Sequence, residues 1–84
     1  MTKPTLTRIG KITIKSLRDF ITDSRFDNDV AILLNIFDFD ELALEHRDTY
    51  AEPLSIPYRI NRILIVEDET GTVIKGKIGV VLDY

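Results

Sequence analysis

Residues 30–37 read Val-Ala-Ile-Leu-Leu-Asn-Ile-Phe, a nearly continuous apolar run in a chain of 84 residues. A half-exposed strand alternates apolar and polar side chains, whereas a short continuous apolar run is typical of a strand that is covered on both faces. The preceding segment, residues 25–29, is polar and turn-like. We therefore expect residues 30–37 to form a central strand of a β-sheet.

The sequence before this run predicts one strand and one helix. Apolar side chains recur at strand spacing from Leu6 to Lys15, with Gly10 at a position where a β-bulge would shift the register. Ser16 resembles a helix cap, and the apolar residues after it recur at helical spacing. We expect a strand followed by a short helix that ends near Ser24.

The sequence after the run predicts a second helix and two more strands. Asp38 has the position of a helix cap, and Glu41 stands three residues later, as in a capping box. Pro53 and Pro57 remove backbone donors and predict a loop over residues 49–57. The remaining elements are a strand from about Ile56 or Tyr58 to Glu67, a hairpin turn over residues 68–71 and a final strand that reaches Tyr84.

Together these elements predict a single α+β domain over residues 1–84, with residues 1–5 as a flexible lead. The order β-α-β-α-β-β gives a four-stranded mixed sheet, two short helices and a C-terminal antiparallel hairpin. Two short helices cover only one face of such a sheet, and exposed strand edges favour pairing with another chain. We therefore expect a homodimer or a larger homo-oligomer.

The composition argues against several kinds of function. The chain has no cysteine and one histidine, His46, so it offers neither a disulfide framework nor a zinc site of thiolates or clustered histidines. Its longest wholly apolar run, residues 30–34, is much shorter than the ~20 residues of a membrane span, and the N-terminus lacks the hydrophobic segment of a signal peptide. We expect no cofactor, no membrane partner and a cytoplasmic location.

Charge is segregated along the chain, although the net charge is only -3. Residues 1–18 carry five cations and no acid, residues 19–52 carry ten acids and two cations, and residues 53–84 are balanced. Such segregation indicates either charge pairing within the fold or between subunits, or a surface that steers a charged partner. Direct binding of nucleic acid is not expected, because the protein as a whole repels phosphate.

The acidic segment places its carboxylates at helical spacing. On a helix that begins at Asp38, one stripe contains Asp38, Glu41, Glu45 and Asp48, and Glu52 extends it. Like charges four residues apart cost a helix a few tenths of a kcal/mol, so another interaction must offset this repulsion. We predict that these five residues form a surface that binds a basic protein partner.

Residues 36–42 resemble the first motif of haloacid-dehalogenase-type phosphatases, in which one aspartate attacks phosphorus and a second serves as the acid. The matching residues are Asp38 and Asp40. The segment departs from the motif where Glu41 and Leu42 replace its Gly-Thr pair, and the 42 residues that follow are too few for the rest of that family's domain. We therefore interpret Asp38 as a helix cap and Asp40 as a first-turn acid that faces the helix dipole.

Residues 63–69 are similar to the first strand and acidic pocket of response-regulator receiver domains. A receiver places its phosphorylated aspartate far downstream of that strand, and only fifteen residues follow Glu69 here. We interpret the segment as a buried strand that enters an acidic turn.

A metal site remains a hypothesis that depends on strand order. If the second and third strands were parallel neighbours, Asp38 and Asp40 would approach Glu67 and Asp68. A group of carboxylate oxygens would suit Mg²⁺ or Ca²⁺. Because nothing in the spacing demands this adjacency, no residue is assigned as a metal ligand.

The leading functional hypothesis is a non-catalytic interaction or assembly module. It would self-associate through its sheet edges or its uncovered sheet face and present its acidic helix to a basic partner. The alternatives are an acidic inhibitor that mimics nucleic acid and a divalent-metal-dependent phosphoryl-transfer enzyme. No residue is assigned as catalytic, because no serine or cysteine nucleophile stands out near His46, which we interpret as a packed side chain.

Overall fold

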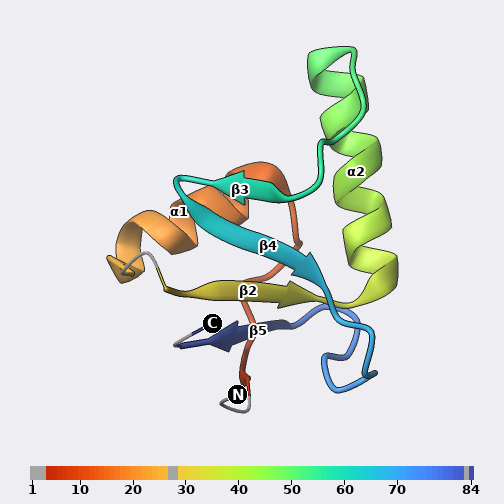
Figure 1. Ribbon diagram of the computed structural model, residues 1–84. Coiled ribbons are helices and arrows are strands. Elements are labelled where there is room, and N and C mark those ends of the chain that lie inside the picture. The colour runs from red at the N-terminus through yellow and green to blue at the C-terminus, as the bar shows by residue number, and fades with distance from the viewer. Residues whose placement is uncertain (1–3, 27–28, 83) are drawn as a thin grey trace.

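The apolar run forms the central strand of the sheet, as predicted. The computed structural model describes residues 4–26, 29–82 and 84, and in it strand β2 (Ala31–Leu34) is parallel to β4 (Ile63–Glu67) and antiparallel to β5 (Ile78–Val81). Strands β1 (Thr5–Thr7) and β3 (Tyr58–Ile60) form the edges, and the strand order is β1-β5-β2-β4-β3 (Figure 1). The predicted α+β class and mixed sheet are confirmed, with five strands instead of four.

The N-terminal strand is shorter than predicted, because it ends at Thr7 instead of Lys15. Gly10 follows with a φ of +85°, a left-handed backbone that glycine adopts readily. Thr13 caps helix α1 (Ile14–Ser24) through a capping box. The Thr13 hydroxyl accepts from the Ser16 N–H at 3.0 Å, and the Ser16 hydroxyl accepts from the Thr13 N–H at 2.8 Å. The prediction that Ser16 is the cap is therefore wrong by one turn.

Helix α2 (Ile36–Tyr50) begins inside the predicted central strand. Its cap is Asn35, whose side-chain oxygen accepts a hydrogen bond from the backbone N–H of Phe37 at 2.9 Å. This cap ends the strand at Leu34 rather than at Phe37. The prediction that Asp38 caps the helix is wrong, because Asp38 already lies in the first turn.

The third predicted strand is two strands, β3 and β4, which are joined by a tight turn. Asn61 and Arg62 both have positive φ, +48° and +74°, as the central residues of a type I′ hairpin turn do. Ile60 pairs with Ile63 directly beside the turn. Neither turn residue is glycine, so the sequence lacks the usual signal, and the prediction of one continuous strand is wrong.

The predicted C-terminal hairpin is also wrong. In the described part of the chain, β4 and β5 do not pair with each other, because β2 lies between them. The residues between them, 68–77, form a loop that packs on the sheet. A Cβ at Gly79 would lie only 2.9 Å from side-chain atoms of both Pro4 and Val73, so glycine permits this close approach.

The helices and one face of the sheet share the core. Helix α1 lies behind the sheet in Figure 1, and α2 stands beside the ends of β2 and β4. Core residues that are buried include Ile14, Leu17 and Ile21 of α1, Phe39 and Leu42 of α2, and Ile32, Leu34, Ile63, Ile65, Ile78 and Val80 of the sheet.

Part of the predicted flexible lead, residues 1–3, lies outside the described residues. Thr5, its last residue, is the first residue of β1.

Within the described residues, neither helix combines the length and the apolar composition that a membrane crossing requires.

Candidate interaction surface

Apolar side chains lie on the side of the sheet that faces away from α1. Leu64 pairs with Ala31, and Val66 pairs with Leu33. Side chains alternate along a strand, and Ile65 points into the core, so these four side chains lie on the opposite face. Ala31 is fully buried, whereas Leu33, Leu64 and Val66 are half-buried.

Two exposed residues extend this apolar surface. Tyr84 and Ile56 line the same groove as Leu33, Leu64 and Val66, and the groove has a volume of about 570 Å³. We call these five residues the open face. Ile56 is 74% exposed, and it also lines a second groove of about 510 Å³ beside α2. A contiguous apolar surface that contains so exposed an isoleucine is typical of a contact site for another molecule.

The two ends of the open face carry opposite charge. Arg59 pairs with Leu64 and so lies on this side of the sheet, and Arg62 follows at the hairpin turn. The Arg59 guanidinium donates to the backbone carbonyl of Arg62 at 2.9 Å, which keeps the two residues together. At the other end of β4, the exposed residues Glu67 and Glu69 line the groove. Glu67 pairs with the core residue Leu34, so its side chain leaves the end of β4 on the side of α1, whereas Glu69 follows the strand.

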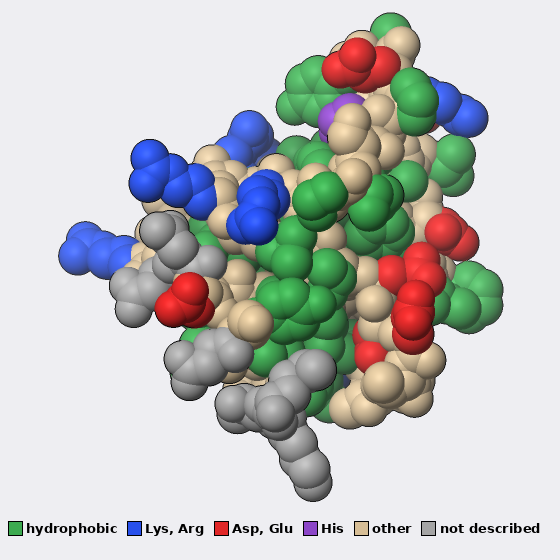
Figure 2. Space-filling view, viewed as in Figure 1, with side chains coloured by type: hydrophobic (Ala, Val, Ile, Leu, Met, Phe, Trp, Pro, Cys, Tyr) green, Lys and Arg blue, Asp and Glu red, His purple; other side chains and the backbone are tan. Residues whose placement is uncertain are grey.

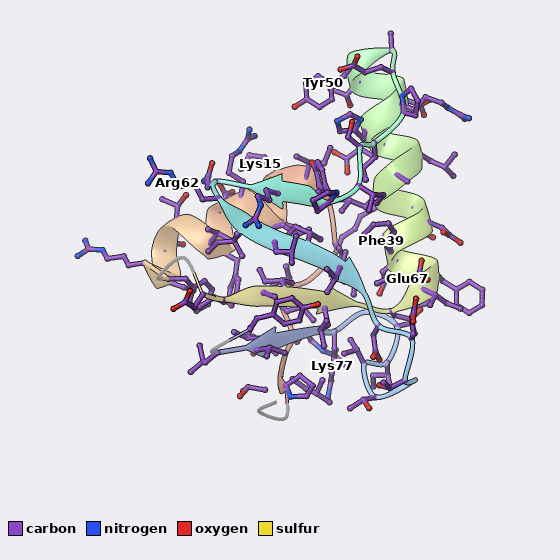
Figure 3. The ribbon with its side chains drawn as sticks, in the orientation of Figure 1. Lys15, Phe39, Tyr50, Arg62, Glu67 and Lys77 are labelled. Carbon is purple, nitrogen blue, oxygen red and sulfur yellow. The ribbon has the colours of Figure 1, made fainter. Side chains whose placement is uncertain are left out.

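The figures show how the charges are distributed around this surface. In Figure 2, green hydrophobic side chains run down the middle of the visible face, with Lys and Arg side chains at upper left and Asp and Glu side chains at lower right; further acidic side chains lie at the left, below the basic group, and at the top. Figure 3 places Arg62 and Glu67 at opposite ends of strand β4. The open face is thus an apolar surface between a basic end and an acidic end.

The predicted acidic stripe is not one uniform outward surface. Its first four residues lie on α2, and Glu52 follows the helix. Asp38 is buried, at 5% exposure, and Glu45 is half-buried. The Glu45 carboxylate accepts a hydrogen bond from the backbone N–H of Ile14 at 3.0 Å, so it holds α2 to the start of α1. The exposed members of the stripe are Glu41, Asp48 and Glu52.

Asp38 and Glu41 share a cation that comes from the loop 68–77. The Lys75 ammonium lies 3.3 Å from Asp38 Oδ1 and 3.5 Å from Glu41 Oε1. The Gly76 N–H donates to Asp38 Oδ2 at 2.8 Å. The hydrogen bond to Asp38 is the main cause of the raised pKa of Lys75. The repulsion expected along the stripe is therefore offset within the chain, because Lys75 pairs with Asp38 and Glu41 and the Ile14 N–H donates to Glu45.

The other buried carboxylate, Asp68, orders the loop 68–77. Its Oδ1 accepts from the Thr70 N–H at 3.1 Å and from the Thr70 hydroxyl at 2.7 Å, and its Oδ2 accepts from the Val73 N–H at 2.7 Å. These bonds, that from Val73 first, lower the pKa of Asp68. The Asn35 side-chain amide donates to the Val73 carbonyl at 3.1 Å and ties the loop to the start of α2.

These contacts bear on the metal hypothesis. The adjacency that it needed is present, because β2 and β4 are parallel neighbours. The oxygens of Asp38 and Asp68 nevertheless accept hydrogen bonds from the loop. Across the ranges 4–26 and 29–82, no three His, Asp or Glu side chains come close enough together to hold a metal ion.

His46 is packed between aromatic rings. Its ring centroid lies 4.8 Å from that of Tyr50 and 5.6 Å from that of Tyr58, and its Nδ1 lies 3.1 Å from the Glu52 carbonyl oxygen. Burial is the main cause of the raised pKa of Tyr58. The cluster holds the last turn of α2 against β3.

No protein-family model, curated protein or solved structure matches this chain.

The sequence predicted a poorly covered sheet face without identifying its residues. In the structure Pro4 and Val73 approach Gly79 on this side and Ala31 is fully buried, so the more open part of the face lies at Leu33, Leu64 and Val66. Leu64 and Val66 belong to a continuous apolar run, which is typical of a strand that is covered on both faces. The pattern does not indicate which face α1 covers, and only the packed structure shows it. The basic end was missed because the hairpin turn that creates it carries no glycine.

Proposed function

We propose that this protein is a non-catalytic assembly module that self-associates through its open face. The observation that carries the proposal is the apolar groove lined by Leu33, Leu64, Val66, Tyr84 and Ile56, which lies between a basic and an acidic end. A second copy of the chain supplies both an apolar surface and charges of the opposite sign. The open face is in this sense complementary to itself.

The edges of the sheet support association through the face rather than through strand addition. The two edge strands, β1 and β3, contain only three residues each. Short edges are one means by which proteins limit edge-to-edge pairing. Pro57, directly before β3, also lacks a backbone N–H that an added strand would use.

The acidic helix supports a partner contact less strongly than the open face does. Asp38, Glu41 and Glu45 take part in contacts within the chain, which leaves Asp48 and Glu52 as the exposed members of the stripe that form no salt bridge with described residues. Two exposed acids match a phosphate backbone poorly, so the nucleic-acid mimic is less well supported. The phosphoryl-transfer alternative loses support because Asp38 is buried beneath Lys75 and Gly76.

A substitution at the most exposed residue of the open face tests the proposal. Ile56→Asp is expected to weaken self-association more than tenfold, because burying a charge in place of an apolar side chain in both copies costs at least about 1.4 kcal/mol. Stability of the monomer should change by less than about 0.5 kcal/mol, since Ile56 is 74% exposed. Sedimentation velocity over a concentration series measures the dissociation constant, and urea unfolding measures the stability.

Ile74→Asp is the matched control for this experiment. Ile74 is also an exposed isoleucine, at 54%, but it lies in the loop 68–77 and does not line the groove of the open face. Its substitution should leave the association unchanged. A wild-type chain that sediments as a monomer at every concentration would overturn the proposed function, and so would equal effects of the two substitutions.

A further inference from the structure

We infer that two copies pack through their open faces with their β4 strands antiparallel, so that Arg59 and Arg62 of one copy face the acidic end of β4, which carries Glu67 and Glu69, in the other. This inference rests on the proposed function and specifies the orientation of the partner. The four charged residues then determine which orientation forms, while the apolar residues supply most of the contact.

The size of the molecule places these charges inside the interface. A stable protein interface buries roughly 800 Å² per partner. The principal extents of this molecule are 35 × 25 × 23 Å, so an interface of that size covers most of one face. The basic and acidic ends of β4 border the open face and therefore fall within the covered area.

Within one chain the two ends do not neutralise each other. Arg62 directly precedes β4 and Glu67 ends it, and at about 3.3 Å per residue this strand separates them by roughly 16 Å. This separation exceeds the Debye length of about 8 Å at physiological ionic strength. Each end therefore interacts mainly with whatever lies directly opposite it.

Symmetry leaves two limiting arrangements for a face-to-face dimer. Its two-fold axis lies between the sheets, in their plane. If the axis runs along β4, the strands are parallel, and each end meets the same end of the partner, so arginine faces arginine and glutamate faces glutamate. If the axis is perpendicular to β4, the strands are antiparallel, and each basic end meets an acidic end. Like charges opposed in an interface are unfavourable, so the antiparallel arrangement forms.

Charge reversal of one end, and then of both, tests the orientation. The double variant R59E/R62E makes both ends acidic, and it is expected to weaken self-association about tenfold in low-salt buffer, because repulsion appears at both ends of the dimer. The fully exchanged variant R59E/R62E/E67R/E69R has its ends reversed. It should self-associate within about threefold of the wild type, since opposite charges again face each other.

Mixing distinguishes the two orientations. In the antiparallel arrangement, a wild-type copy and a fully exchanged copy place like charges opposite each other, so mixed dimers should be depleted. In the parallel arrangement the same mixture places opposite charges together, and mixed dimers should be enriched. Native mass spectrometry of ¹⁵N-labelled wild type mixed with the unlabelled variant counts the mixed species directly.

The variant K11E/K15E is a control with the same change in net charge. Both lysines are exposed on or just before α1, which lies on the other side of the sheet (Figure 3). Association should be unaffected by this variant, and circular dichroism and urea unfolding confirm that every variant is folded.

Each result supports or overturns the orientation. Weakening by R59E/R62E, recovery in the exchanged variant and depletion of mixed dimers support it. Enrichment of mixed dimers, or no effect of R59E/R62E in a wild type that does associate, overturns the antiparallel orientation and leaves the proposed function standing. If the wild type does not self-associate at any concentration, both the antiparallel orientation and the proposed function are overturned.

Discussion

Replacing Leu42 with alanine is expected to lower the free energy of unfolding by about 3 kcal/mol, as large-to-small changes in a core do. Leu42 is fully buried, and with Phe39 it is one of only two buried apolar residues on α2. The substitution leaves a cavity where the helix packs against the core. A chain of this length has a total stability of roughly 4–12 kcal/mol, so the loss is a large fraction of it.

Leu44→Ala is the matched control, because Leu44 lies two residues later on the same helix and is 50% exposed. Both substitutions remove the same atoms and have the same effect on helix propensity. The control should cost less than about 1 kcal/mol. Urea unfolding followed by circular dichroism gives both values. Equal losses for the two variants would show that α2 is not anchored through Leu42.

The class of the fold and its central strand were predictable, because they depend on local pattern. The continuous apolar run at residues 30–37 indicated a central strand, and β2 has a neighbouring strand on each side, β4 and β5. The boundaries were less predictable, because short polar residues redirect the chain. Thr13 and Asn35 each cap a helix with one side-chain oxygen, and each displaces apolar residues from an expected strand into a helix.

Strand order could not be predicted, because it depends on contacts between distant residues. The last strand follows β4 after a turn-like segment, and a local hairpin is the simplest interpretation of that sequence. Instead β5 is inserted between β1 and β2, and the loop that allows this is held by Asp68 and Asn35. A side chain that ties a loop to a helix thirty-eight positions away leaves no periodic signal in the sequence.

The acidic residues illustrate the same limit at the candidate site. Helical spacing correctly placed Asp38, Glu41, Glu45 and Asp48 on one helix. It could not show that Lys75, from a loop far along the chain, would pair with two of them. The residues of the open face could not be predicted either, because the packing of the helices determines which side of the sheet is covered.

Replacing Asp68 with asparagine is expected to lower the free energy of unfolding by about 2 kcal/mol at neutral pH. The carboxylate accepts three hydrogen bonds from Thr70 and Val73 while it is itself buried, and bonds to a charged acceptor are each worth roughly 1.5–3 kcal/mol. Asparagine is neutral, and its NH₂ group would face a backbone N–H that needs an acceptor. The loop 68–77 should loosen first, which amide hydrogen exchange at Val73 would detect.

The destabilisation should depend on pH in a defined direction. The pKa of Asp68 is lower in the folded protein than the value of about 3.9 for an unfolded aspartate. Its contribution is therefore fully present above the unfolded pKa, and it is lost as the pH falls through the folded pKa. The difference in stability between wild type and Asp68→Asn should shrink in that acidic range. Asp23→Asn, at an exposed position of α1, is the control for the same chemical change and should alter the stability by less than about 0.5 kcal/mol. A loss for Asp68→Asn that stays constant into acid would contradict the assigned role.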